Sequence, residues 1–294
     1  MPSYERLADR PAVVLRERIK RVFKELPGAL VGKTDPIHQV RVAGRRLRVA
    51  LPLITLKPKG RRVRRSLAVL RELTRTVGLG RDLDVVVGLL ERHLASGTEP
   101  SPEQRVLLRR LRAARTRSHR RLTEGLLDLD IDGLRYDLRR VMRKGTADVF
   151  TVLTRVREVR ELEGAAILLG FAEVGERYDP EALHALRRRA RRLRYSAELS
   201  DALRSEESGA SAVWKRLQDA LGALHDHHVL AGWLEEQAAA AEARGQAALA
   251  EAARAEREAF VAEGHRLHHE LLEAKPAELA TGALDAMGRV RSVA

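Results

Sequence analysis

Two segments of the chain concentrate basic side chains without an acidic residue among them. Residues 38–65 hold ten Lys and Arg residues and residues 184–194 hold six, in a chain with 55 Lys and Arg against 41 Asp and Glu and a net charge of +14. Guanidinium groups bind phosphate through two hydrogen bonds at once and are weakly hydrated. The chemistry that these segments favour is therefore the binding of phosphate-like anions.

Both basic segments follow the pattern His-x-x-Arg-x-x-x-Arg-Arg-Leu-Arg, and each precedes a Gly-x-x-x-Asp block. These blocks lie at residues 78–82 and 222–226, so the two motifs recur in the same order, at offsets of 146 and 144 residues. Matched offsets indicate an internal duplication, with halves at residues 1–145 and 146–294. The side chains that recur in the basic pattern are His38, Arg41, Arg45 and Arg48 in the first half and His184, Arg187, Arg191 and Arg194 in the second.

At about 100° per residue, the recurring His and Arg positions lie on one face of a helix, and Leu and Ala residues lie on the opposite face. The charged face lacks the acids at i,i+4 spacing that would neutralise it. One such face is most often simply solvated, but two in the same register favour a groove for a ligand with many negative charges. The next helix adds weaker candidates, Arg64, Arg71 and Arg75, and Lys215 matches Arg71 in the second half.

Composition and helix punctuation predict an all-α fold. Ala, Leu and Arg dominate, aromatic residues make up 3% of the chain, and no alternating apolar run indicates a strand. Asp35 and Asp179 each precede a proline, which is typical of an N-cap before the first helical position. Ser101 begins a sequence with the spacing of a capping box. Residues 58–60 and Gly209 divide the remaining chain into segments of helical length.

Several classes of protein are excluded or disfavoured by what the sequence lacks. The absence of cysteine excludes disulfides, Cys-ligated zinc, iron–sulfur clusters and thiol nucleophiles. The N-terminus does not resemble a secretion signal, and the longest apolar run, Gly164–Ala172, is about half of a membrane span. We therefore expect a cytoplasmic protein without membrane insertion. No G-x-S-x-G, H-E-x-x-H or G-x-G-x-x-G motif is present, so we expect neither an enzyme nor a bound cofactor.

The run His-Asp-His-His at residues 225–228 is a segment that invites a metal site. The internal repeat argues against that interpretation, because Asp226 corresponds to Asp82, which follows Arg81 in place of a histidine. What both copies share is an aspartate that we expect at a helix junction, where it would cap a helix or pair with an arginine. Metal binding by His225, Asp226, His227 and His228 stays an open hypothesis.

The motifs resemble those of the CHAD proteins, a family of α-helical domains named for conserved histidines. The resemblance spans nearly the whole chain and is carried by Ile37–Arg48, Gly80–Val85, His184–Tyr195 and Leu221–Asp226. It implies two four-helix bundles related by pseudo-two-fold symmetry around a basic central pore that binds inorganic polyphosphate. The recurring His and Arg side chains would face this pore. Two departures from the family pattern are His228, which replaces an acid, and Gly44, which we expect to interrupt the first motif helix.

Some proteins of this family also carry a triphosphatase domain that begins with a Glu-x-Glu-x-Lys strand, a pattern that is absent here. The resemblance thus implies a stand-alone, non-catalytic binding module on cytoplasmic polyphosphate granules, with other polyanions as further ligands. A second hypothesis is a protein that binds the nucleic-acid backbone, although Tyr195 alone among the aromatic residues lies in a main basic run, so bases lack a stacking platform. A metal-dependent phosphohydrolase and an interaction protein whose charge is incidental are less favoured hypotheses.

Overall fold

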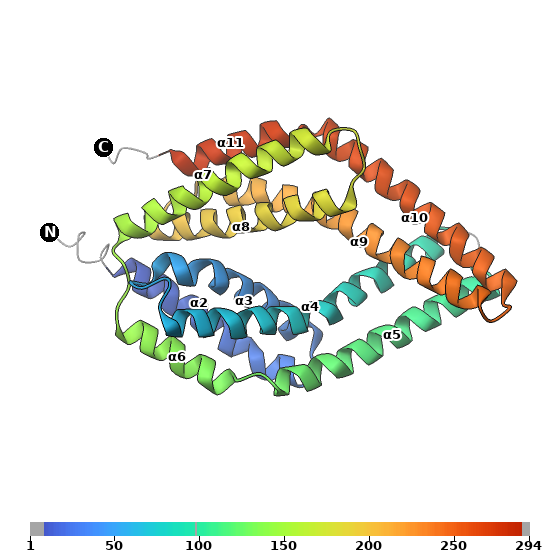
Figure 1. Ribbon diagram of the computed structural model, residues 1–294, viewed down its shortest axis with the longest axis horizontal. Coiled ribbons are helices and arrows are strands. Elements are labelled where there is room, and N and C mark those ends of the chain that lie inside the picture. The colour runs from blue at the N-terminus through green and yellow to red at the C-terminus, as the bar shows by residue number, and fades with distance from the viewer. Residues whose placement is uncertain (1–8, 98, 290–294) are drawn as a thin grey trace.

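The computed structural model describes residues 9–97 and 99–289, apart from the side chains of Leu79 and Arg81. Within this part of the chain the regular structure is helical, with one isolated β-bridge between Thr55 and Thr146, so the all-α prediction is confirmed. The helices of Figure 1 are α2 (Arg10–Leu30), α3 (Thr34–Ile54), α4 (Arg61–Ser96), α5 (Pro102–Leu127), α6 (Ile131–Arg143), α7 (Val149–Val174), α8 (Pro180–Arg204), α9 (Ala210–Glu242), α10 (Ala247–Glu273) and α11 (Pro276–Gly288).

The helices repeat in order between the two halves of the chain. Helices α2 to α6 have 21, 21, 36, 26 and 13 residues, and α7 to α11 have 26, 25, 33, 27 and 13. Residue 145 lies in the short connection between α6 and α7. These lengths agree with the internal duplication that the motifs indicate, while the pseudo-two-fold symmetry and the division at residue 145 stay predictions.

Local sequence signals account for most of the helix starts. The Ser101 side chain accepts a hydrogen bond from the backbone N–H of Gln104, whose own side chain completes the capping box of α5. Asp179 caps α8 by accepting two backbone hydrogen bonds at 3.0 Å. The expectation for Asp35 is wrong, because α3 begins one residue earlier, at Thr34, and leaves the Asp35 side chain inside the first turn.

The apolar faces of the helices enclose two cores. The larger core includes buried residues of α2, α3, α6, α7, α8 and α11 together with the N-terminal parts of α4 and α9, among them the fully buried Trp214. The smaller core lies between α5, α10 and the C-terminal parts of α4 and α9. Each half thus contributes helices to both cores, and the long helices α4 and α9 run from one core to the other (Figure 1). Burial of each large apolar side chain stabilises this arrangement by about 1.5–3 kcal/mol.

The Gly-x-x-x-Asp blocks lie inside continuous helices, so the expected helix junctions at Asp82 and Asp226 are wrong. Helix α4 passes through its glycines without a break, as α9 does. Gly44 likewise does not interrupt α3. A Cβ atom there would lie 2.8 Å from Thr74 Cγ2, so this glycine allows α3 to approach α4 closely.

Contacts between the halves join α2 and α3 to α7 and α8. Arg10 of α2 donates a hydrogen bond to the backbone oxygen of Leu203 at 2.8 Å. Arg155 of α7 donates to the carbonyl groups of Leu53 and Thr55 at the end of α3, at 2.9 and 2.8 Å. Helices α3 and α8 pack together, and α4 packs against α9. No helix of the described chain combines the length and the apolar character needed to cross a membrane.

Candidate functional site

The packing of α3 against α8 brings the arginines of the two basic motifs together. Burial lowers the pKa of Arg45 to about 8, with the charges of Arg191 and Arg41 as the next causes. Burial also lowers the pKa of Arg191 to about 10, with Arg187 as the next cause and smaller contributions from Arg41 and Arg48. We call these five residues, Arg41, Arg45, Arg48, Arg187 and Arg191, the central arginine cluster.

The lowered pKa values show that the cluster holds positive charge at a free-energy cost. Guanidinium groups remain protonated in nearly all proteins, so the cost is borne as mutual repulsion and incomplete hydration. Arg48 is in the same situation, because burial and then the charge of Arg71 lower its pKa. A bound anion would remove the cost by supplying negative charge to several guanidinium groups at once.

Each of the recurring glycines lies against one arginine of its own half. A Cβ atom on Gly78 would lie 3.9 Å from Arg41 Nε, and one on Gly222 would lie 3.5 Å from Arg187 Nε. The two arginines thus lie over equivalent glycines of α4 and α9. Both distances are ordinary van der Waals contacts, so a Cβ atom would also fit at these two positions.

Aspartates lie beside these two arginines. Arg41 Nη2 donates a hydrogen bond to Asp82 Oδ1 at 2.9 Å, so the expectation of an arginine-paired aspartate is confirmed for the first half. Burial raises the pKa of Asp226, and the nearby charge of Arg187 opposes this shift. The charge of Asp82 raises the pKa of Asp226 further, which places both aspartates at the same end of the cluster.

A pair of histidines lies next to Arg187. The Nδ1 atoms of His184 and His225 are 3.0 Å apart, so one of the two carries the proton that the other accepts. Burial lowers the pKa of His225 to about 4, with Arg187 and His184 as the next causes. Burial and then Arg188 lower the pKa of His184. Both rings are therefore neutral near pH 7 in the free protein. His225 is not among the anion-binding candidates taken from the basic motifs. Its position directly before Asp226, in the second Gly-x-x-x-Asp block, is the signal that could have identified it.

Three acidic residues from other positions neutralise part of each basic motif. Glu198 accepts hydrogen bonds from Arg46 at 2.7 and 3.0 Å and from Arg194 at 3.1 Å. The buried Glu163 of α7 binds two further arginines of α8, and the buried Asp137 of α6 binds two of α4. Of the candidates, Arg194 is thus committed to an ion pair. Glu198 lies four residues after Arg194 on α8, so the expectation that the charged face lacks acids at i,i+4 spacing is wrong there, whereas Glu163 and Asp137 come from other helices.

The remaining candidates differ in exposure and in whether an acid pairs with them. Arg71 is exposed and close enough to influence Arg48, whereas Arg64 is exposed on the first turn of α4. Arg75 is exposed and pairs with Glu72 of its own helix. Lys215 is exposed and binds Asp219 at 2.6 Å. His38 is half-buried on α3. Arg75 and Lys215 therefore have local counter-charges and lie outside the central arginine cluster.

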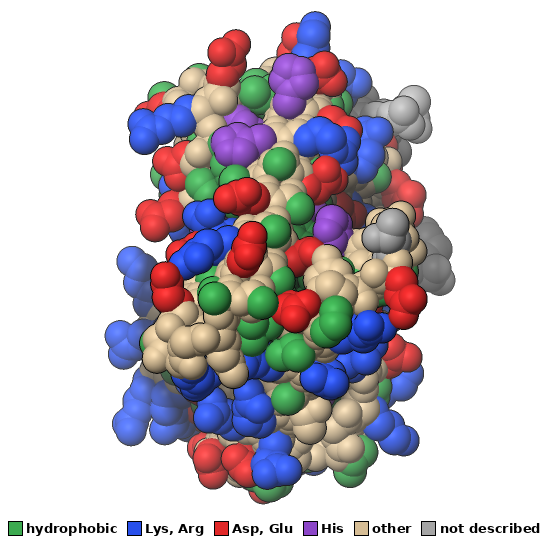
Figure 2. Space-filling view, turned by 90° about the vertical axis from the view of Figure 1, so that its right-hand side faces the viewer, with side chains coloured by type: hydrophobic (Ala, Val, Ile, Leu, Met, Phe, Trp, Pro, Cys, Tyr) green, Lys and Arg blue, Asp and Glu red, His purple; other side chains and the backbone are tan. Residues whose placement is uncertain are grey.

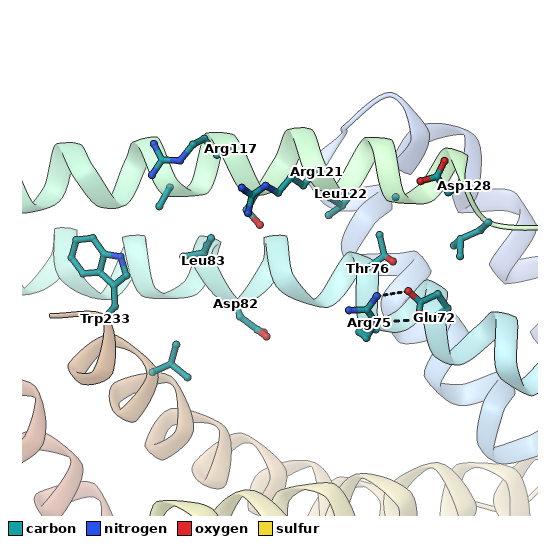
Figure 3. Close-up of a pocket in the computed structure, with 15 residues that line it drawn as sticks. Glu72, Arg75, Thr76, Asp82, Leu83, Arg117, Arg121, Leu122, Asp128 and Trp233 are labelled. Carbon is teal, nitrogen blue, oxygen red and sulfur yellow. Dashed lines mark hydrogen bonds and ion pairs between the residues drawn. The ribbon is translucent and has the colours of Figure 1, made fainter. Parts of the chain in front are cut away.

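A cleft of about 850 Å³ adjoins the cluster at Asp82. Figure 3 shows Arg117 and Arg121 extending from α5 and Arg75 lying on α4, with the Trp233 indole of α9 near one end. Sequence reasoning missed the two α5 arginines because this helix does not repeat the His-x-x-Arg motif, although residues 104–123 contain no acid. Its eight arginines within residues 102–127 are the signal that was present in the sequence.

Positive charge is concentrated in the first half of the chain. Residues 1–145 contain 35 Lys and Arg against 16 Asp and Glu, for a net charge of +19, whereas residues 146–294 contain 20 against 25, for −5. In Figure 2, Lys and Arg side chains gather over the lower part, the side of α5 in Figure 1, and acidic and histidine side chains are frequent over the upper part. An approaching polyanion would be attracted to the surfaces of α2 to α6.

The candidate metal run does not assemble into one site. Its four residues occupy consecutive positions of α9, so their side chains point in different directions around the helix. His227 is buried and its Nδ1 lies 2.8 Å from the Ala223 carbonyl oxygen, whereas His228 is exposed. In the described part of the chain, no three His, Asp or Glu side chains gather closely enough to hold a metal ion.

Comparisons with known proteins agree with the motifs. A family model for the CHAD domain matches residues 13–235. Two uncharacterized proteins of Mycobacterium tuberculosis, one from each of two strains, are 30% identical over 225 residues, which cover 72% of this chain and 42% of the relative. The chain thus spans less than half the length of these curated relatives. The crystal structure of the CHAD domain from the plant Ricinus communis matches 97% of this chain and 92% of its own, with a TM-score of 0.66 and 20% identity, and shows a shared fold.

Proposed function

The chain belongs to the CHAD domain family, and we propose that it binds inorganic polyphosphate, without catalysing a reaction, through the central arginine cluster. The observation that carries the proposal is the convergence of arginines from both halves into one cluster whose pKa values are lowered by burial and by mutual repulsion. Such a cluster is more stable with a polyanion than without one. We propose further that the protein lies in the cytoplasm on polyphosphate granules, where this ligand would be concentrated.

A linear phosphate chain fits the arrangement of these charges. It carries about one negative charge per phosphate and no bulky group, so it can follow guanidinium groups that lie on two packed helices. Orthophosphate is too short to contact α3 and α8 arginines together and would displace few counterions. Duplex DNA carries similar charge but is much wider, so it would reach exposed arginines such as Arg64 and Arg71 more readily than the half-buried Arg45.

Each group of residues has its own role in this proposal. Arg45 and Arg191 lie at the centre and bind the chain from opposite halves. Arg41 and Arg187, placed over their glycines, extend the contact on either side. His184 and His225 become protonated when phosphate oxygens replace the repelling cations as their nearest charges. The residues that attract the chain from solution are the exposed Arg64, Arg71, Arg75 and Lys215.

Competition binding tests the proposal. Long-chain polyphosphate labelled with a fluorophore is bound to the protein at one fixed salt concentration and displaced with unlabelled polyphosphate, orthophosphate or duplex DNA. We expect displacement by polyphosphate at the lowest concentration of charge. Preferential displacement by DNA would favour a nucleic-acid backbone ligand instead, and shortening of the polyphosphate during incubation would show that the protein is an enzyme.

A matched pair of variants assigns the site. Arg191→Gln removes one charge from the cluster, and Arg257→Gln removes one charge from α10, where Arg257 binds Glu235 at 2.5 Å. The first should weaken polyphosphate binding strongly and the second should not. Equal losses in both variants would mean that the total charge of the protein, and no particular site, determines binding.

A further inference from the structure

A groove with an apolar floor and a basic rim lies between α2 and α6, on residues that take no part in the central arginine cluster. It consists of two hollows of about 480 and 310 Å³, which share Ile19 and Arg139 and are therefore continuous. We call it the α2–α6 groove. Its floor is Ile19, Phe23, Leu138 and Met142, and its rim is Arg16, Arg135, Arg139 and Arg143.

Helical periodicity builds this groove from both helices. Residues 16, 19 and 23 of α2 and residues 135, 139 and 142 of α6 each follow i, i+3 or i+4 spacing along one face. Eight residues of an α-helix rise about 11 Å, or two turns. The groove therefore has the length over which two or three side chains on one face of another helix can be inserted.

The charge of the rim is uncompensated. None of the four rim arginines forms an ion pair with an acid in the described residues. Arg135 lies over the Phe23 ring, with its guanidinium carbon 4.8 Å from the ring centre. The buried acid of α6, Asp137, faces α4 instead and binds Arg62 and Arg65. An occupant of the groove would thus meet apolar surface flanked by positive charge.

We propose that the α2–α6 groove docks an acidic amphipathic helix of a partner protein. Apolar side chains at i and i+4 of that helix would cover the partly exposed Ile19 and Met142, and carboxylates on its flanks would bind the rim arginines. Inorganic polyphosphate has no apolar part and would leave the floor uncovered. A bilayer surface is flat and would bridge the groove without filling it.

A designed peptide serves as the probe. It is a fluorescein-labelled helix of about 15 residues, long enough to be stabilised by side-chain bridges, with Leu at i and i+4 positions and Glu on both flanks. Its control peptide keeps every Glu and replaces each Leu by Ser. Fluorescence anisotropy should give at least tenfold weaker binding for the control peptide. Equal binding of both peptides would reduce the contact to unspecific charge attraction and overturn the proposal.

Variants of the protein locate the contact. Met142→Gln in the floor and Arg139→Gln on the exposed rim should each weaken peptide binding at least tenfold and change polyphosphate binding no more than the control Arg109→Gln does, so that failure here is distinguishable from failure of the proposed function. Arg109→Gln, an exposed arginine of α5 without an ion pair in the described chain, is the matched control. Should Met142→Gln lose helicity in circular dichroism, Arg139→Gln carries the test alone.

A membrane surface or a second copy of this chain as the occupant would give different results. Sedimentation with vesicles of anionic phospholipid that depends on Met142 and Arg139, without peptide binding, would assign the groove to a membrane surface. A dimer of the protein alone that disappears in Met142→Gln would assign it to a second copy of this chain. Either result would overturn the proposal.

Discussion

Replacing Arg45 by Gln should weaken polyphosphate binding while leaving the free protein at least as stable. Arg45 lies half-buried on α3, with its pKa lowered by burial, by Arg191 and by Arg41. Since its charged form is disfavoured in the folded protein, removal of the charge relieves repulsion in the absence of ligand. In the complex the same charge would face phosphate, so its loss removes an attractive interaction.

The magnitude follows from the composition of the cluster. Five arginines contacting phosphates, with the coefficient for single-stranded nucleic acid of about 0.7 per phosphate, give a log–log salt slope of about −3.5, and four give about −2.8. A hydrogen bond to a charged group contributes about 1.5–3 kcal/mol. The loss of one such contact therefore weakens binding about 10- to 150-fold at fixed salt.

Binding titrations at several salt concentrations measure the salt slope and the loss of affinity, and thermal unfolding of the free protein measures stability. Arg257→Gln serves as the control, since it removes the same charge from α10. An unchanged salt slope together with reduced stability in Arg45→Gln would refute the reasoning, because it would show that Arg45 holds the fold together and does not contact the ligand.

Further predictions concern pH and packing. Binding of polyphosphate should take up protons and strengthen as the pH falls from about 8 to 6, because phosphate raises the lowered pKa values of His184 and His225; calorimetry in buffers of different ionisation enthalpy measures the uptake, which should disappear in the His184→Gln, His225→Gln double variant. In the free protein the pKa of His225 is about 4, below the value of about 6.5 for an unfolded histidine, so between these pH values the unfolded state binds the proton more readily. The free energy of unfolding should therefore be unaffected by this group above about pH 6.5 and fall as the pH falls toward 4. The melting temperature of His225→Gln should depend less on pH in that range. Glu198→Gln should lower stability by about 1–3 kcal/mol in denaturant unfolding, since it removes the charged partner of Arg46 and Arg194, without weakening polyphosphate binding; a loss of binding would show that this ion pair holds the site in place. Gly44→Ala should cost about 1–3 kcal/mol of stability and also weaken binding, because the new Cβ would meet Thr74, whose hydroxyl oxygen accepts a hydrogen bond from Arg48 at 2.9 Å; full stability would contradict the close approach of α3 and α4.

The sequence by itself determined the features that depend on neighbouring residues. Helical periodicity is local, so the placement of Arg41, Arg45 and Arg48 on one face of a helix follows from their spacing alone. Capping chemistry is local too, as the confirmed starts at Ser101 and Asp179 show. The internal duplication needs only a comparison of the two halves, and it pointed to the arginines that the fold brings together.

Only the tertiary structure decided which charges are compensated and what the matched glycines contact. Glu163 and Asp137 lie on different helices from the arginines that they bind, so no spacing in the basic motifs could reveal these ion pairs. The matched glycines resemble helix breaks in the sequence, yet each lies inside a long helix beneath a guanidinium group from another helix. The physical reason is the same in both cases: electrostatic and steric contacts depend on distance in space, which packing sets between residues that are far apart in the chain.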